Sequence, residues 1–335
     1  MSFQKFLHIA VSGKDMSEEE MMAAMTEVMD GKVGDTQLAA FLTALHFKNV
    51  TVPEIVGAAR VMRDKAEKVN AKDSVDTCGT GGDGADTFNI STTVAFVVAG
   101  AGVRVAKHGN RAVSSKSGSA DVLKYLGVNI DASLPTVERC IEEVGIGFLF
   151  APLMHKAMKH AAAVRKALGF RTIFNLLGPL TNPANAHAQV LGVFDSKWVT
   201  PLAEVLRELG SRHALVVHGF DGLDEITLTG ETQIAELKNG KVNNFSFDPK
   251  EFGYSLCSVA DLKGAEPETN AEIMREILNG SSGPKTDIVV LNAAAAIYVG
   301  GKADSIEKGI LAAKNSIESG AALKKLEELC RVSNS

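Results

Sequence analysis

Two segments of the sequence concentrate hydrogen-bond donors. Residues 79–84 read GTGGDG, and four glycines in six residues let the backbone adopt positive φ angles and a ligand approach the amide groups. Residues 107–119 read KHGNRAVSSKSGS and combine cations with serine hydroxyls. Amides, hydroxyls and fixed cations suit phosphate oxygens. Together the two segments predict a site for a heavily phosphorylated small molecule.

An acidic pair would complement such a ligand. Asp224 and Glu225 are adjacent in a Gly-rich turn that follows a predicted strand ending at His218. A di- or triphosphate carries several negative charges, and Mg²⁺ held by one or two oxygen side chains is its usual complement. A solvated acidic turn is the alternative, and the position at a strand end favours the metal.

The glycine segment has two other interpretations. A glycine cluster after a strand is often only a tight turn. Residues 79–84 also match the dinucleotide fingerprint G-x-G-x-x-G, which opens directly onto a helix and is followed about 20 residues later by an acidic residue. Here the helix is expected only from about Asn89, and the next strand leads into Lys107 and His108. Cations therefore stand where the acid is expected, which disfavours a dinucleotide.

The elements that must position these residues follow an alternating pattern from residue 73 onward. Short β-branched runs separated by helical or Gly-rich segments predict an α/β fold with a mainly parallel central sheet flanked by helices. The predicted strands are 74–78, 103–106, 146–150, 189–193 and 214–218. Ligands collect at the carboxyl edge of such sheets, so both donor-rich segments are expected there as loops. Residues 226–247 predict an antiparallel hairpin at one edge.

Residues 1–72 predict a small N-terminal helical domain, and residues 73–335 a larger α/β domain. Ser17 with Glu20, and Thr51 with Glu54, form capping boxes, and Asp35 is expected to cap a third helix. The apolar side chains of these helices exceed what four short helices easily hide, which favours contact with a second copy, ordinary core filling being the alternative. The side chains in question are Met21, Met22, Met25, Met29 and Phe47.

The segment that follows the third strand carries many cations. Residues 154–168 predict one helix, and the two prolines of 178–183 mark a chain crossing. The segment 164–183 is expected to pack back against the helical domain.

Composition excludes several classes of protein. A net charge of −5 argues against a general nucleic-acid binder. The four cysteines are widely spaced, which indicates reduced thiols and neither a zinc site nor a disulfide framework. The N-terminal residues do not resemble a signal peptide, and the most apolar runs are too short to span a bilayer. We expect a cytoplasmic protein without a membrane or nucleic-acid partner.

Four motifs resemble the anthranilate phosphoribosyltransferase family of the tryptophan pathway, and the likeness covers essentially the whole chain. They are 76–83 (DTCGTGGD), 89–92 (NIST), 107–115 (KHGNRAVSS) and 175–183 (NLLGPLTNP). The resemblance implies transfer of the phosphoribosyl group of phosphoribosyl pyrophosphate (PRPP) to the amine of anthranilate, with release of pyrophosphate. It also implies Mg²⁺ as cofactor, no dedicated general base, and a homodimer formed through the helical domain.

The family's roles carry over residue by residue. The implied PRPP contacts are Gly79, Gly82, Asp83, Thr87, Asn89, Ile90, Ser91, Thr92, Lys107, His108, Gly109, Asn110, Arg111, Ala112, Val113, Ser114, Ser115 and Ser119. The implied anthranilate contacts are Gly79, Asn110 and Arg165, and the implied magnesium ligands are Ser91, Asp224 and Glu225. From the sequence alone, an ordinary surface arginine on a basic helix is the favoured interpretation of Arg165.

Two other functions fit parts of the pattern. A nucleoside phosphorylase on the same fold would share the glycine segment and would require free phosphate and a nucleoside. A binding or regulatory protein would keep the loops without chemistry, but Asp224, Glu225 and Arg165 argue against it.

Overall fold

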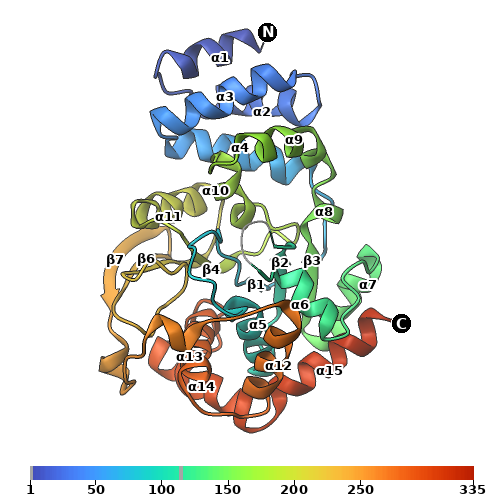
Figure 1. The fold of residues 1–335 in the computed structure, drawn as a ribbon, viewed down its shortest axis with the longest axis vertical. Helices are drawn as coiled ribbons and strands as arrows, with labels where there is room; N and C mark the ends of the chain where they lie inside the picture. The colour runs from blue at the N-terminus through green and yellow to red at the C-terminus, as the bar shows by residue number, and fades with distance from the viewer. Residues whose placement is uncertain (1–2, 113–115) are drawn as a thin grey trace.

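Four amphipathic helices form one end of the molecule (Figure 1). The computed structural model describes residues 3–112 and 116–335. The helices are α1 (Gln4–Val11), α2 (Glu18–Met29), α3 (Asp35–Lys48) and α4 (Val52–Lys65). Both predicted capping boxes are confirmed at the starts of α2 and α4. The third helix differs, because Gly34 is its N-cap and Asp35 is its first residue.

The methionines of this end fill its core. Met21, Met25 and Met29 are buried and Met22 is half-buried, so the expectation that they form a contact surface was wrong. Their flexible side chains fit the irregular space between short helices. Phe47 alone of the predicted set is exposed, with 77% of its surface accessible.

A seven-stranded sheet occupies the middle of the molecule, in the order β3-β2-β1-β4-β5-β6-β7. The strands are β1 (Val75–Asp76), β2 (Val105–Gly109), β3 (Ile146–Phe150), β4 (Ala188–Gly192), β5 (His213–Gly219), β6 (Thr232–Lys238) and β7 (Lys241–Phe247). β1 to β5 pair in parallel, and β6 and β7 add an antiparallel hairpin at one edge. The predicted fold class and edge hairpin are confirmed.

The second strand is longer than the sequence predicts. β2 continues to Gly109, with Lys107 opposite Phe148 and His108 opposite Leu149. The β-branched signal ends before Lys107, and only pairing with β3 reveals the extension. Lys107 and His108 are therefore strand residues, and their expected place on a loop was wrong.

Helices cover both faces of the sheet. On one face, α5 (Ile90–Gly100) and α13 (Pro284–Val299) pack on the strands, backed by other C-terminal helices. That outer group comprises α12 (Pro267–Leu278), α14 (Ile306–Glu318) and α15 (Ala321–Ser333), with α6 (Ser119–Tyr125) and α7 (Leu134–Arg139) beside them. On the other face, α11 (Val199–Glu208) packs on β5 and β6. None of the described helices has both the length and the apolarity needed to cross a membrane.

The segment after β3 forms three α-helices and a short 3₁₀-helix (Lys156–Met158), where one helix was predicted. The α-helices are α8 (Ala151–Met154), α9 (Lys159–Leu168) and α10 (Ile173–Leu180). His155 leaves the helical conformation, with φ −114° and ψ 61°, so the predicted single helix over 154–168 was wrong. Pro179 lies inside the last turn of α10, and the chain crossing begins after it.

Helices α9 and α10 belong to the same core as the N-terminal helices. α9 packs against α2 and α3, and α10 against α3 and α4. Val164 and Phe174 are buried in the cluster that also holds Phe41 and Leu45. This cluster extends to the α11 face of the sheet, so the helical end and the sheet share apolar contacts.

Candidate functional site

The glycine segment follows β1 and lies against the end of β4 and the acidic turn. Thr80 N–H donates to Gly192 O at 2.8 Å, and Phe194 N–H donates to Thr80 Oγ1 at 3.1 Å. Gly81 N–H donates to Asp224 Oδ2 at 2.7 Å. Two motifs that are 143 residues apart in sequence are thereby brought into contact.

Glycine is required where this segment meets the acidic turn. A Cβ on Gly79 would lie 2.5 Å from Asp224 Oδ2. Gly81 and Gly82 have φ angles of 64° and 76°, a conformation that other residues rarely adopt. The glycines therefore allow the close approach of this segment to Asp224 and its left-handed turn.

The start of α5 joins the two donor-rich segments. Asn89 is its N-cap residue, and Ile90, Ser91 and Thr92 form the first turn. Asn89 Nδ2 donates to Ser117 O at 3.1 Å, and Ser117 Oγ donates to Asn89 Oδ1 at 3.0 Å. Ile90 N–H donates to Phe88 O at 2.7 Å, and the other first-turn amides have no acceptor within the helix, so they can serve as donors to an anion.

Lys107 is a buried cation between these elements. Its Nζ donates to Thr77 O at 2.9 Å and to Ser91 Oγ at 3.2 Å, and the residue is only 3% exposed. The ammonium group therefore lies between the end of β1 and the start of α5.

The rest of the second segment continues from β2 into α6. A Cβ on Gly109 would lie 2.5 Å from Ser119 Oγ, which places Ser119 beside the strand end. Arg111 pairs with Asp121 at 3.3 Å, and Ala112 N–H donates to the same carboxylate at 2.9 Å. The predicted contacts Val113, Ser114 and Ser115 lie outside the described residues.

Three further predicted PRPP contacts have local partners in the structure. Asp83 Oδ1 accepts from Ala85 N–H at 3.1 Å, which closes the glycine segment. Thr87 forms an isolated antiparallel bridge with Lys263. Asn110 accepts Arg111 N–H on its own side chain at 2.8 Å.

The acidic turn holds more negative charge than its protein neighbours balance. Burial and the nearby Asp83 raise the pKa of Asp224 to about 7. Burial and the adjacent Asp224 raise the pKa of Glu225 well above its usual range, and Lys107 only partly opposes this shift. A buried carboxylate is costly unless a cation pairs with it.

The oxygen atoms of Ser91, Asp224 and Glu225 are of the kind that ligate a small divalent cation. Ser91 and Glu225, but not Asp224, line a cavity of about 10 Å³, roughly the space of one water-sized sphere. Thr77, Gly79 and Gly192 line the same cavity. Hydroxyl and carboxylate oxygens are the ligands that Mg²⁺ prefers.

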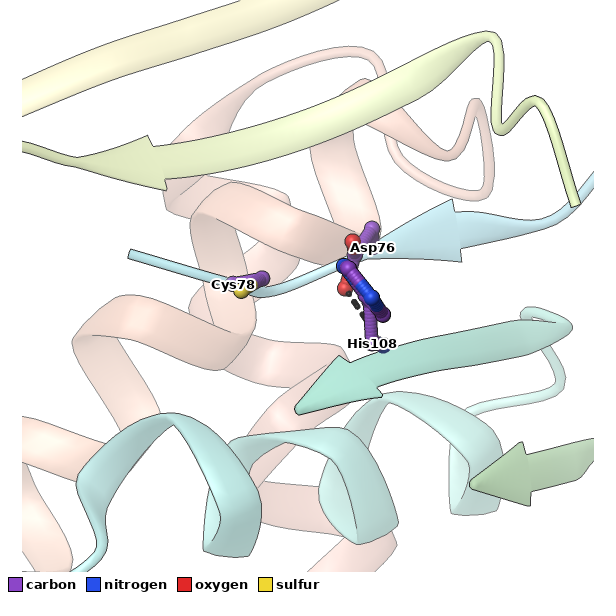
Figure 2. Close-up of side chains that lie close together, drawn as sticks. All are labelled: Asp76, Cys78 and His108. Atoms are coloured by element: carbon purple, nitrogen blue, oxygen red, sulfur yellow. Dashed lines mark hydrogen bonds between the residues drawn. The ribbon is translucent and has the colours of Figure 1, made fainter. Parts of the chain in front are cut away.

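Asp76, at the end of β1, carries a second buried carboxylate. Atoms of Asp76, Cys78 and His108 lie within 4.8 Å of one another (Figure 2). Asp76 Oδ1 accepts the His108 backbone N–H at 3.2 Å, and Oδ2 accepts Asn182 Nδ2 at 2.7 Å. Both carboxylate oxygens are thus engaged by protein donors, and burial raises the pKa of the Cys78 thiol to about 12. Asp76 thus connects the end of β1 to β2 and to Asn182 through hydrogen bonds.

Arg165 lies on α9, on the side of the helical domain. It is half-buried, its guanidinium lies 5.2 Å from the Phe174 ring centre, and burial lowers its pKa. Within residues 3–112 and 116–335, no hydrogen bond or ion pair joins Arg165 to Gly79 or Asn110. The role of Arg165 in binding anthranilate therefore stays a prediction.

Comparison with known proteins identifies the family. The model of the glycosyl transferase family, a/b domain, matches residues 71–323, and the helical bundle domain of that family matches residues 4–66. An anthranilate phosphoribosyltransferase of Acetivibrio thermocellus is 54% identical over 334 residues, 99% of this chain and 97% of the relative. This chain belongs to the anthranilate phosphoribosyltransferase family. The predicted resemblance, the enzyme class of glycosyltransferase and the place in tryptophan biosynthesis are confirmed.

Solved structures of anthranilate phosphoribosyltransferases have the same fold. The enzyme from Thermus thermophilus aligns with a TM-score of 0.94 at 43% identity, covering 98% of this chain and 99% of its own. The enzyme from Saccharomyces cerevisiae in complex with PRPP and Mg aligns with a TM-score of 0.90 at 28% identity, covering 99% and 98%. Magnesium as the family's cofactor is thereby supported.

The sequence did not indicate the roles of two residues that donate hydrogen bonds to the site from other parts of the chain. Asn182, within the predicted chain crossing, reaches both Asp76 and Ala106 O, at 2.7 and 2.8 Å. Arg171 donates from Nη2 to Gly82 O. Asn182 belongs to the motif 175–183, whereas no local sequence pattern indicates the role of Arg171.

Proposed function

We propose that this chain transfers the phosphoribosyl group of PRPP to the amine of anthranilate and releases pyrophosphate. The observation that carries the proposal is the contact between Gly81 N–H and Asp224 Oδ2 at 2.7 Å. It joins a donor-rich loop to a carboxylate pair, which is what a ligand carrying both phosphates and a metal ion requires. Family membership supplies the substrate pair.

PRPP is held by the edge of the sheet. The glycine segment and the first turn of α5 offer amide groups, and the end of β2 offers Lys107 together with the residues up to Ser119. We assign the whole predicted set to PRPP, with Val113, Ser114 and Ser115 assigned from the sequence alone. Charge-assisted hydrogen bonds from Lys107 and the amides stabilise the pyrophosphate as its bond to the sugar breaks.

Ser91, Asp224 and Glu225 would hold Mg²⁺. When bound, the ion supplies positive charge that complements the departing pyrophosphate. The raised pKa of Asp224, at about 7, supports this assignment because a cation in the turn would offset the burial of the carboxylates. Lys107 provides a fixed cation beside Ser91, to whose Oγ its Nζ donates at 3.2 Å.

Anthranilate is bound from the side of the helical domain. The planar guanidinium of Arg165 matches a carboxylate in a bidentate pair, and Gly79 and Asn110 lie on the sheet edge that the amine must reach. The aryl amine is neutral at physiological pH, so positioning and electrostatic stabilisation suffice without a general base. Burial lowers the pKa of His108 to about 3, so it is neutral and unsuited to act as an acid.

The protein is proposed to form a homodimer through the helical domain. Phe47 is 77% exposed and Phe170 is 38% exposed, with His46 in ring contact with both at 5.5 and 4.9 Å. These aromatic residues of α3 and the α9–α10 turn form an apolar surface patch of the kind that interfaces cover. All four cysteines are free thiols, which fits the proposed cytoplasmic location.

Loss of anthranilate fluorescence tests the function. The purified protein is mixed with anthranilate and PRPP, with Mg²⁺ or with a chelator. We expect fluorescence to fall only when PRPP and Mg²⁺ are both present, with pyrophosphate released in equal amount. Unchanged fluorescence, together with cleavage of a nucleoside in the presence of free phosphate, would instead establish the phosphorylase.

A further inference from the structure

Arg171 contacts the glycine segment from outside the sheet. It lies in the turn between α9 and α10, and its Nη2 donates to the carbonyl oxygen of Gly82. Its guanidinium also lies over the Phe194 ring, 4.1 Å from the ring centre. The side chain is solvent-exposed, and in the described part of the chain it forms no ion pair with a carboxylate.

Three consecutive residues of the glycine segment are held by three different partners. Thr80 is bonded to the end of β4, and Gly81 to the acidic turn after β5. Gly82 is bonded to Arg171. The first two partners belong to the sheet, and the third belongs to the helices that share a core with the N-terminal domain.

A glycine segment needs such a restraint more than other loops do. Gly82 has no side chain and a φ angle of 76°, so its conformation is selected only by main-chain contacts. A disordered loop loses conformational freedom when it closes on a ligand, and that loss weakens binding. The carbonyl of Gly82 and the N–H of Asp83 share one peptide plane, so fixing this carbonyl fixes the direction of the Asp83 N–H.

The two contacts of Arg171 suit an arginine and not a lysine. A flat guanidinium can stack on Phe194 with its face while an edge N–H reaches Gly82. An ammonium group cannot make both contacts in that arrangement. Without an acidic partner, the residue is not explained as half of a surface salt bridge.

The same stretch of chain carries Arg165. That residue is on α9, six positions before Arg171, and packs on Phe174 of α10. The turn between the two helices thus connects the proposed anthranilate side to the proposed PRPP loop.

We propose that Arg171 is a positioning residue that holds the glycine segment in its PRPP-binding conformation from the anthranilate side. This inference rests on the proposed function, because it names how one substrate's loop is held. Arg171 acts through Gly82 and is not a catalytic residue.

The test compares Arg171→Met with Lys166→Met, which removes an exposed charge on α9 that makes no hydrogen bond or ion pair within the described residues. We expect Arg171→Met to raise the KM for PRPP about tenfold, the size of one charge-assisted hydrogen bond, with the KM for anthranilate and the melting temperature unchanged. Lys166→Met should match the wild type in every measurement. Arg171→Lys should keep most of the defect, since the charge is retained but the stack and the fork are lost.

Phe194→Leu tests the second contact. The variant should raise the KM for PRPP less than Arg171→Met, and the double variant should be no worse than Arg171→Met alone, because both changes act on one guanidinium. Additive effects of the two changes would contradict this shared role.

The outcomes separate this inference from the proposed function. An inactive wild type under both substrate conditions would remove the function itself. An active wild type with an Arg171→Met KM for PRPP within twofold of normal would overturn the inference alone. So would equal rises in both KM values or a full recovery in Arg171→Lys, because either would mean that charge or general stability is what matters.

Discussion

Gly192 supports the main-chain carbonyl of Asp224 so closely that any Cβ on Gly192 would overlap it. The last residue of β4 therefore packs directly against the backbone of the acidic turn. Since β4 also accepts Thr80 N–H at the same residue, one glycine fixes the relative position of the donor loop and the carboxylates.

The first prediction concerns this contact between Gly192 and Asp224. Gly192→Ala should displace the acidic turn, destabilise the protein by about 1–3 kcal/mol as in other overpacked sites, and remove most turnover. Urea unfolding and initial rates measure the two effects. Gly230→Ala is the matched control, because its Cβ would meet nothing within 4 Å. Wild-type rates in Gly192→Ala would show that the turn need not rest there.

The carboxylate pair gives a second prediction. Asp224→Asn combined with Glu225→Gln should abolish Mg²⁺-dependent turnover, because neutral amides bind the cation poorly. Without Mg²⁺ the same variant should be at least as stable as the wild type, since it removes two adjacent carboxyl groups whose ionised forms are disfavoured by burial and by each other. Rates over a magnesium titration and melting curves in chelator test both statements. A variant that keeps its rate would place the metal elsewhere.

Asp76 predicts a dependence of stability on pH. Burial raises its pKa to about 6, above a typical unfolded value of about 3.9, so the folded state holds this proton more tightly. Its contribution to stability is complete below about pH 4 and is lost as pH rises through about 6. The loss is of the order of 1–3 kcal/mol.

Asp76→Asn should flatten this slope, measured by urea unfolding at several pH values, while exposed Asp131→Asn should leave it unchanged. An identical slope in the wild type and Asp76→Asn would show that other groups cause it.

Substitution of Arg165 should change the KM values of the two substrates to different extents. Arg165→Ala should raise the KM for anthranilate by about 10- to 100-fold and leave that for PRPP nearly unchanged, because a bidentate pair with the carboxylate is lost. Steady-state kinetics with each substrate varied in turn provide the measurement. A normal KM for anthranilate would return Arg165 to the role of a helix residue stacked on Phe174.

The aromatic patch predicts the oligomeric state. Phe47→Glu should convert the proposed dimer to a monomer, because a buried unpaired carboxylate is costly at an interface. Leu311→Glu is the control, since Leu311 is 66% exposed on α14 at the other end of the molecule. Sedimentation equilibrium measures the mass. A wild type that is monomeric at all concentrations would contradict the dimer.

Local signals in the sequence predicted much of this molecule. The capping boxes at Ser17 and Thr51 are complete within four residues, and the parallel strands appear as β-branched runs. The extension of β2 through His108 depends on pairing with β3, and no sequence pattern that we recognised indicated the break in the helix at His155.

The candidate site likewise contains residues that local sequence indicates and residues that only the fold brings together. Its glycines, its carboxylate pair and Lys107 are recognisable as motifs. Asn182 and Arg171 act on Asp76 and Gly82, which are 106 and 89 residues away along the chain, and only the fold brings them together. The prediction that the methionines of α2 form a contact surface was wrong because composition alone does not show which face of a helix is covered.

The place of Lys107 in β2 has a kinetic consequence. A lysine on a mobile loop must give up its rotational freedom when an anion arrives, whereas this side chain is already immobilised between Thr77 and Ser91. Its charge is preorganised by the sheet, so an incoming pyrophosphate meets a stationary electrostatic field and little solvent or side chain has to rearrange as the bond to the sugar breaks.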